Sequence, residues 1–102
     1  MLTSKQRAYL RGLSNPIDTI VIVGKDGVTD NVVIQVSDAL RARELIKGKV
    51  LESALLTARE VSDELCSRCK CDAVQCIGSK FVLYKRNEKE PKIVLPSDKK
   101  KR

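Results

Sequence analysis

The chain has 102 residues and a formal net charge of +7 at neutral pH. That length fits one domain with a hydrophobic core of its own, and no apolar run is long enough to span a bilayer. The N-terminus lacks the apolar segment of a secretory signal, so we expect a cytoplasmic protein without a membrane partner. The excess of basic residues favours an anionic partner, most often nucleic acid, although a merely well-solvated surface is the alternative.

The composition argues against catalysis and against stacking of bases on aromatic side chains. Histidine is absent, which removes the commonest general base and the commonest metal ligand. The sequence also shows neither a nucleotide-binding glycine pattern nor an evident pair of catalytic carboxylates, so we expect a noncatalytic protein with no cofactor and no small-molecule substrate. Only Tyr9, Phe81 and Tyr84 are aromatic, too few for a protein that stacks successive bases.

A short helix is predicted at the start of the chain. Thr3 followed by Gln6 has the spacing of a capping box, and the helix should end near Gly12. Arg7 and Arg11 stand four residues apart, so both point the same way from this helix. They are candidate contacts for a phosphate backbone, and an ordinary solvated face is the alternative.

The next segment predicts a strand that leads into a glycine-containing loop. Residues 17–23 are mostly apolar and β-branched, as in a central strand covered on both faces or shielded by its neighbours. The two glycines of Gly24-Lys25-Asp26-Gly27 allow the backbone to approach a ligand closely. Lys25 adds a mobile positive charge, whereas Asp26 suits the turn itself. Alone, such a tetrapeptide is more often an ordinary turn, for example of a hairpin.

Helical periodicity after this loop argues against the hairpin. Thr29 is the predicted N-cap of a helix from about Asp30 to Arg43. A loop that enters a helix presents backbone N–H groups and the positive end of the helix dipole, which suits a phosphate. Asp30 in the first turn opposes a bound anion.

Residues 45–50 predict a second strand. Lys47 and Lys49 share its polar face and are candidate phosphate contacts if they belong to a larger basic surface. Solvated lysines without a partner are the alternative. Gly48 falls on the apolar face, where we expect it to weaken the strand.

The second half of the chain predicts a helix and a hairpin. Ser53 is the expected cap of the third helix, with Leu55, Ala58 and Leu65 on its buried stripe. Two apolar runs follow, separated by three residues that include Gly78, the pattern of a hairpin. The predicted ranges are strands at 73–77 and 81–85, a short edge strand at 93–95 and a disordered basic tail at 97–102.

Four cysteines lie close together in the sequence: Cys66, Cys69, Cys71 and Cys76. Four thiolates can hold a tetrahedral zinc ion, but this spacing differs from two separated pairs. A redox pair is also disfavoured, because Cys66 and Cys69 close a helix rather than open one. We therefore predict buried or half-buried free thiols and no metal site.

The order helix, strand, helix, strand, helix, strand, strand predicts a two-layer α/β domain with a small mixed sheet. Five segments together resemble the bacterial stand-alone form of the CRM domain (chloroplast RNA splicing and ribosome maturation), the YhbY-like family. The resemblance covers roughly residues 2–96, so we expect a CRM domain at 1–96 followed by the tail. The matching segments are residues 2–7, 10–13, 23–29, 44–47 and 74–85.

The resemblance implies a KH-like fold, similar to the C-terminal domain of translation initiation factor three. It also implies RNA binding, in bacteria on precursors of the large ribosomal subunit, with the family's Gly-x-x-Gly loop at Gly24 to Gly27. Two features depart from the family pattern: Gly48, where a larger apolar residue is typical, and the cysteines.

From the residues and the resemblance together, we expect a monomeric RNA-binding protein that contacts the backbone of ribosomal RNA. A protein-interaction module of a ribosome assembly complex and, less favoured, a zinc-binding protein are the alternatives. The expected RNA contacts are Gly24, Lys25, Asp26, Gly27, Thr29, Arg7, Arg11, Lys47 and Lys49.

Overall fold

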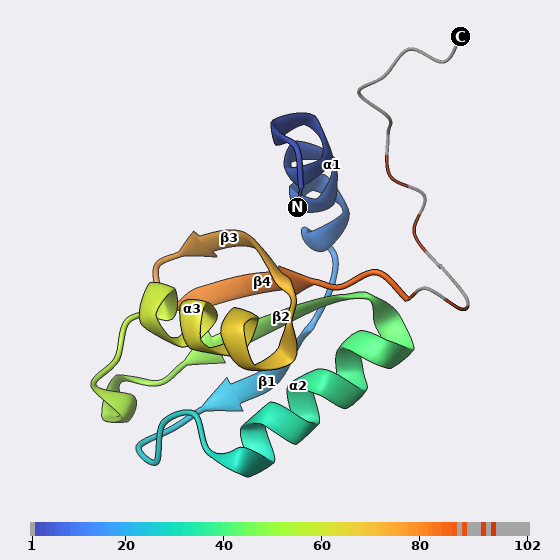
Figure 1. The fold of residues 1–102 in the computed structure, drawn as a ribbon. Coiled ribbons are helices and arrows are strands. Elements are labelled where there is room, and N and C mark those ends of the chain that lie inside the picture. Colours follow the sequence, from blue (N-terminus) through green and yellow to red (C-terminus); the bar gives the residue numbers. More distant parts are fainter. Residues whose placement is uncertain (1, 88, 90–92, 94, 96–102) are drawn as a thin grey trace, which may run out of the picture.

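The computed structural model describes residues 2–87, 89, 93 and 95. Three α-helices and four β-strands alternate in the predicted order, and one short 3-10 helix, η1, precedes the third α-helix (Figure 1). None of the helices in the described part of the chain is long and apolar enough to cross a membrane. The elements are α1 (Ser4–Ser14), β1 (Thr19–Val23), α2 (Asp30–Arg43), β2 (Leu45–Val50), η1 (Glu52–Ala54), α3 (Ala58–Cys69), β3 (Asp72–Ile77) and β4 (Lys80–Tyr84).

The strands form one mixed sheet in the order β1-β2-β4-β3. β1 and β2 are parallel, whereas β4 pairs antiparallel with both β2 and β3. The prediction that β1 is a central strand is wrong, because β1 lies at the edge of the sheet. Only one face of its apolar run is covered: Val21 and Val23 are buried, while Ile22 is 56% exposed on the opposite face.

The sheet has a core on each face. α2 and α3 lie side by side over one face (Figure 1), where residues such as Leu40 and Leu65 pack against Ile46. α1 covers part of the other face, where Leu10 belongs to a second cluster with Leu45. Leu45 and Ile46 are adjacent and both buried because β2 is covered from both sides at this end.

Gly48 is a packing requirement of the sheet. It pairs with Phe81 across β2 and β4, and a Cβ at this position would lie only 2.2 Å from the Phe81 ring. The sequence predicted a weakened strand here. Instead, the missing side chain leaves the space that the buried Phe81 ring occupies.

The predicted capping box of α1 is confirmed: the backbone N–H of Gln6 donates to Thr3 Oγ1 at 3.1 Å, and the N–H of Thr3 donates to the Gln6 side chain. The helix continues past the predicted end at Gly12 to Ser14, whose hydroxyl donates to the carbonyl of Arg11 at 2.8 Å.

The start of α3 was predicted incorrectly. Thr57, not Ser53, caps the helix, in a complete capping box with Glu60. Ser53 lies in η1, which ends at Leu55 in a left-handed conformation with φ 56°. Leu55 consequently leaves the predicted buried stripe and is 90% exposed.

The hairpin of β3 and β4 is confirmed, with Gly78 at φ 59° in its turn. The predicted edge strand at 93–95 is not confirmed, because neither Ile93 nor Leu95 belongs to a strand. The N–H of Ile93 donates instead to the buried carboxylate of Glu44 at 2.7 Å, and the N–H of Asn87 donates to the same carboxylate at 2.6 Å. Residue 94 and the predicted tail lie outside the described residues.

Candidate nucleic-acid interface

The Gly-x-x-Gly segment is a tight turn between β1 and α2. The N–H of Gly27 donates to the carbonyl of Gly24 at 2.9 Å, and the N–H of Thr29 donates to the carbonyl of Gly27 at 3.1 Å. Gly27 has φ 72°, a conformation that favours glycine, whereas Gly24 does not. The amides of Gly27 and Thr29 are thus already bonded within the turn. What the loop offers a phosphate is mainly close approach of its backbone and the charge of the exposed Lys25. Asp26 is exposed at the tip of the turn.

The start of α2 is tied to α3 by one arginine. Thr29 caps α2 by accepting a hydrogen bond from the N–H of Val32. Arg68 of α3 donates to the carboxylate of Asp30 at 2.8 Å and to the carbonyl of Val28 at 3.4 Å. The carboxylate beside it also raises the pKa of Arg68. Asp30, whose negative charge was expected to oppose a bound phosphate, therefore has a cation next to it.

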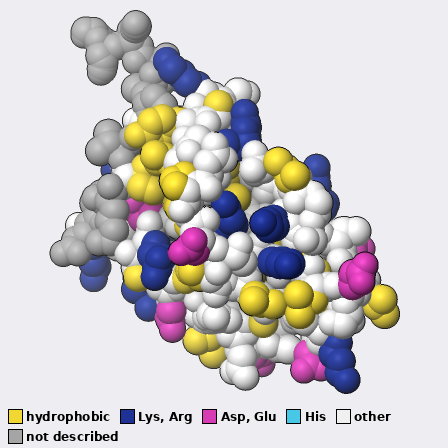
Figure 2. Space-filling view, turned by 180° about the vertical axis from the view of Figure 1, so that it is seen from behind, with side chains coloured by type: hydrophobic (Ala, Val, Ile, Leu, Met, Phe, Trp, Pro, Cys, Tyr) yellow, Lys and Arg dark blue, Asp and Glu magenta, His cyan; other side chains and the backbone are white. Residues whose placement is uncertain are grey.

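Lys47 and Lys49 lie on one face of the sheet, as predicted. Lys49 pairs with Lys80 across β2 and β4, so the side chains of the three lysines project from the same face. Ile22 of β1 pairs with Lys49 on this face as well. We call Ile22, Lys47, Lys49 and Lys80 the lysine face. Figure 2 shows this side of the molecule, with Lys and Arg side chains gathered near the middle and hydrophobic side chains beside them.

The two predicted arginines lie on α1, which packs near β3, the edge strand on the opposite side of the sheet from β1 and the glycine loop. The Nε of Arg7 donates to the carbonyl of Ala73 in β3 at 3.1 Å, so part of its guanidinium holds α1 against the edge strand. Arg11 is exposed. Arg59 of α3 lines the same hollow as Arg7 along β3. The nine predicted residues thus spread across the sheet in three groups rather than forming one compact site.

Leucines of the β2–α3 connection lie directly against the glycine loop. A Cβ placed on Gly24 would be 3.8 Å from Leu51 Cδ1, and one on Gly27 would be 3.6 Å from Leu56 Cδ1. The N–H of Leu51 also donates to the carbonyl of Val23, the last residue of β1. The connection, including the exposed Leu55, therefore lies beside the loop, and the hydrogen bond of Leu51 ties its start to β1.

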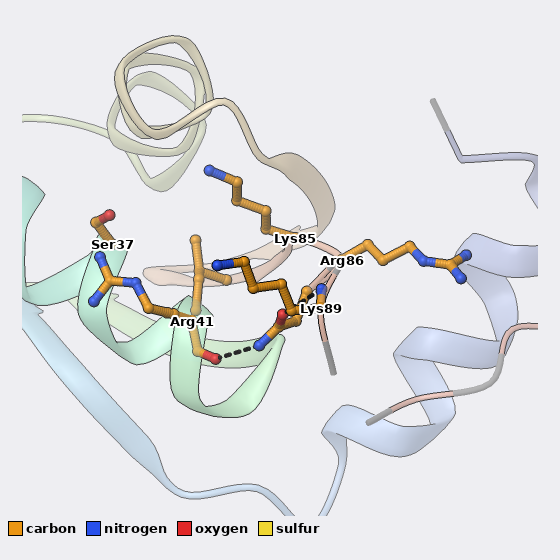
Figure 3. Close-up of a pocket in the computed structure, with 7 residues that line it drawn as sticks. Ser37, Arg41, Lys85, Arg86 and Lys89 are labelled. Carbon is orange, nitrogen blue, oxygen red and sulfur yellow. Dashed lines mark hydrogen bonds between the residues drawn. The ribbon is translucent and has the colours of Figure 1, made fainter. Parts of the chain in front are cut away.

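A second basic site lies at the other end of α2. It is a pocket of about 370 Å³ between α2 and the segment after β4. Arg41 and Lys89 extend into it, whereas Arg86 points away (Figure 3). Arg41 is paired with Asp38 at 3.0 Å, and cations at a helix C-terminus also balance its dipole. The length of α2, about 20 Å, separates this pocket from the glycine loop.

The cysteines are buried or half-buried free thiols, as predicted. The Sγ atoms of Cys66 and Cys71 are 3.8 Å apart, while Cys69 and Cys76 contact the carbonyls of Val33 and Ala58. Among the described residues, no three His, Cys, Asp or Glu side chains gather closely enough to hold a metal ion.

Comparison with known proteins agrees with this architecture. Residues 2–85 match the CRS1 / YhbY (CRM) domain. The chain belongs to the CRS1/YhbY (CRM) domain family. A relative named "Probable RNA-binding protein YqeI" from Bacillus subtilis is 41% identical over 96 residues, which are 94% of this chain and 100% of that protein. A Haemophilus influenzae relative named "RNA-binding protein" is 36% identical and covers 93% of this chain and 95% of its own.

The solution structure of a relative from Staphylococcus aureus, the hypothetical protein SAV1595, superposes on this chain with a TM-score of 0.76. It has 37% sequence identity and covers 94% of this chain and 100% of its own. The predicted α/β fold class and the family resemblance are therefore both confirmed.

Sequence reasoning missed three parts of the CRM domain's surface. Lys80 was assigned to the hairpin connection, although a two-residue turn would have placed it opposite Ile77; its pairing with Lys49 depends on the register of β2 and β4. Arg68 was not among the predicted contacts, although it reaches the start of α2. Leu55 was assigned to the core because the capping box of Thr57 and Glu60, visible in the sequence, was overlooked.

Proposed function

We propose that this protein binds RNA through its phosphate backbone, without catalysis, using the glycine loop and the lysine face together. The observation that carries the proposal is their adjacency. β1 ends in the glycine loop, and Ile22 near that end of β1 pairs with Lys49, which in turn pairs with Lys80. A phosphate chain that passes the loop therefore meets a row of cations within one or two strand widths.

The family supports the nature of the ligand. Its relatives carry the name RNA-binding protein, and a Gly-x-x-Gly loop is the backbone clamp of KH domains. We further propose that the RNA is ribosomal, bound during assembly of the large subunit, and that the protein acts as a cytoplasmic monomer. The ribosomal assignment rests on the family resemblance.

Gly24→Asp is the variant that tests the loop. Gly24 has no positive φ, and a side chain here meets Leu51 only at ordinary contact distance, so the variant should fold. It places a carboxylate where a phosphate would lie, and we expect filter binding to ribosomal RNA to weaken at least tenfold, the effect of about 1.4 kcal/mol.

The matched control is Gln35→Glu. It adds the same charge on the exposed middle of α2, away from the loop and the lysine face, and should leave affinity within about twofold of the wild type, as expected for a screened distant charge. Equal affinities for wild type and Gly24→Asp, with both proteins folded, would exclude the loop as a contact.

Sequencing of RNA crosslinked to the protein in cells tests the ribosomal assignment. The expected result is enrichment of large-subunit ribosomal RNA and its precursors. Crosslinks that yield mainly protein adducts would favour the alternative, a protein-interaction module of an assembly complex.

A further inference from the structure

The connection between β2 and α3 exposes apolar side chains beside the glycine loop. Leu51 and Leu56 are 38% and 37% exposed, and Leu55 between them is 90% exposed. The side chains of Leu51 and Leu56 lie next to the loop, since a Cβ on Gly24 or Gly27 would be within 4 Å of their Cδ1 atoms. We call Leu51, Leu55 and Leu56 the leucine patch.

Leu55 is held outward by the local backbone. Its N–H donates to the carbonyl of Glu52 at 3.1 Å and closes η1, which places the residue in a left-handed conformation. Residues other than glycine are disfavoured there. The complete capping box of Thr57 and Glu60 begins α3 immediately afterwards. A large apolar side chain in a disfavoured conformation, directed into solvent, is a feature that a bound partner would explain.

The setting favours a nucleobase as that partner. The patch presents three side chains, far fewer than the 20 to 30 residues a side of a stable protein interface. An RNA strand whose phosphate lies at the glycine loop would carry its base within reach of the neighbouring leucines. Apolar side chains including leucine contact or separate bases in other nucleic-acid complexes. Phe81 and Tyr84 are buried, so they offer no stacking surface.

We infer that the leucine patch is a subsite for an unpaired base of the RNA whose backbone is held by the glycine loop, with Leu55 packing against the face of that base. This inference rests on the proposed function. It adds a preference for single-stranded RNA that backbone contacts alone do not supply.

Two RNAs of equal length and charge test the inference. One is a short single-stranded oligomer, and the other carries abasic sites along its whole length. Wild type, Leu55→Ala and the control Ile34→Ala are compared by fluorescence anisotropy; Ile34 is 57% exposed on α2 and loses a similar side chain. Both positions are exposed, so neither variant removes core packing.

We expect Leu55→Ala to weaken binding of the intact oligomer about fivefold to tenfold, within the range of one lost base contact. It should bind the abasic RNA like the wild type, and Ile34→Ala should match the wild type on both. Equal binding of the intact oligomer by wild type and Leu55→Ala would overturn the inference alone, as would an equal loss on both RNAs. If the wild type binds neither the intact nor the abasic RNA, the proposed function is overturned and this inference with it.

Discussion

Gly48 and Phe81 form the closest fit in the sheet, since a Cβ on Gly48 would overlap the buried ring. We predict that Gly48→Ala lowers the free energy of unfolding by about 1–3 kcal/mol, the usual cost of overpacking a core. Urea denaturation measures this. Gly12→Ala is the control, because nothing lies within 4 Å of a Cβ there and alanine is the better helix former, so stability should rise by about 0.5–1 kcal/mol. A neutral Gly48→Ala would contradict the packing described here.

The thiols differ in their expected reactivity. The hydrogen bond from the Cys71 thiol is the largest influence on the Cys66 thiol, and it lowers the pKa of Cys66 against the opposing effect of burial. The hydrogen bond with Cys66 and burial raise the pKa of Cys71, and burial raises that of Cys69.

The thiolate is the nucleophile, so iodoacetamide should label Cys66 before Cys69 and Cys71 at mildly alkaline pH. As the pH falls, Cys66 should be the last of the three to lose its reactivity. Mass spectrometry of timed peptide digests gives the order. Labelling of Cys69 or Cys71 before Cys66 would be inconsistent with these pKa directions.

Residue-level prediction from sequence succeeded where a local rule acts alone. Thr3 with Gln6, and Thr29 before its helix, follow from capping geometry and are found in the structure. The rule failed at Ser53 because a complete capping box begins four residues later, at Thr57, and sets the start of the helix. Gly48 was misjudged because its role depends on Phe81, a residue 33 positions away (81 − 48) that only the register of β2 and β4 brings opposite.

At the scale of elements, the true start of α3 can be tested by two substitutions. Thr57→Ala removes the hydroxyl that accepts a hydrogen bond from the N–H of Glu60, and this loss of the cap should lower the free energy of unfolding by about 1 kcal/mol. Ser53→Ala should change it by less than about 0.5 kcal/mol, as expected at an exposed site without a cap. Thermal unfolding of the two variants distinguishes them; a larger loss for Ser53→Ala would restore the original prediction of the helix start.

The contact between α3 and the start of α2 should affect RNA binding through charge. Arg68→Ala leaves the carboxylate of Asp30 without the cation that now lies 2.8 Å from it. We predict a modest, twofold to fivefold loss of RNA affinity, because the ion pair is exposed and screened by solvent. Adding Asp30→Asn should restore most of the loss, because the uncovered charge is then gone. A double variant as weak as Arg68→Ala would mean that Arg68 acts on RNA directly.

Strand order was the least predictable property of the elements. The apolar run of β1 indicated a covered central strand, but consecutive apolar residues also occur where one face packs and the other carries function. Ile22 was therefore predicted to be covered, although it is exposed beside lysines. Pairing partners are set by tertiary contacts, and periodicity within one strand does not reveal them.

At the scale of the whole molecule, the two faces of the sheet differ in what covers them. α2 and α3 cover one face, and the other carries α1 and the lysine face (Figure 2). Element order, fold class and family followed from the sequence. The clustering of Lys80 and the leucine patch with the glycine loop did not, because it depends on strand register and on the path of the connection after β2.

The central claim is that RNA phosphates contact the lysine face beside the glycine loop. Its most direct test is the salt dependence of single-stranded RNA binding by wild type and by a variant with Lys47, Lys49 and Lys80 all changed to glutamine. A matched variant changes Arg41, Arg86 and Lys89 to glutamine and so removes the same charge at the far end of α2. Each phosphate contact contributes about 0.7 to the slope of log K against log salt concentration.

If the account is correct, the slope for the lysine-face variant becomes shallower by about 2, from three lost contacts of about 0.7 each. The slope for the matched variant should stay closer to that of the wild type. A lysine-face variant with the wild-type slope would contradict the account.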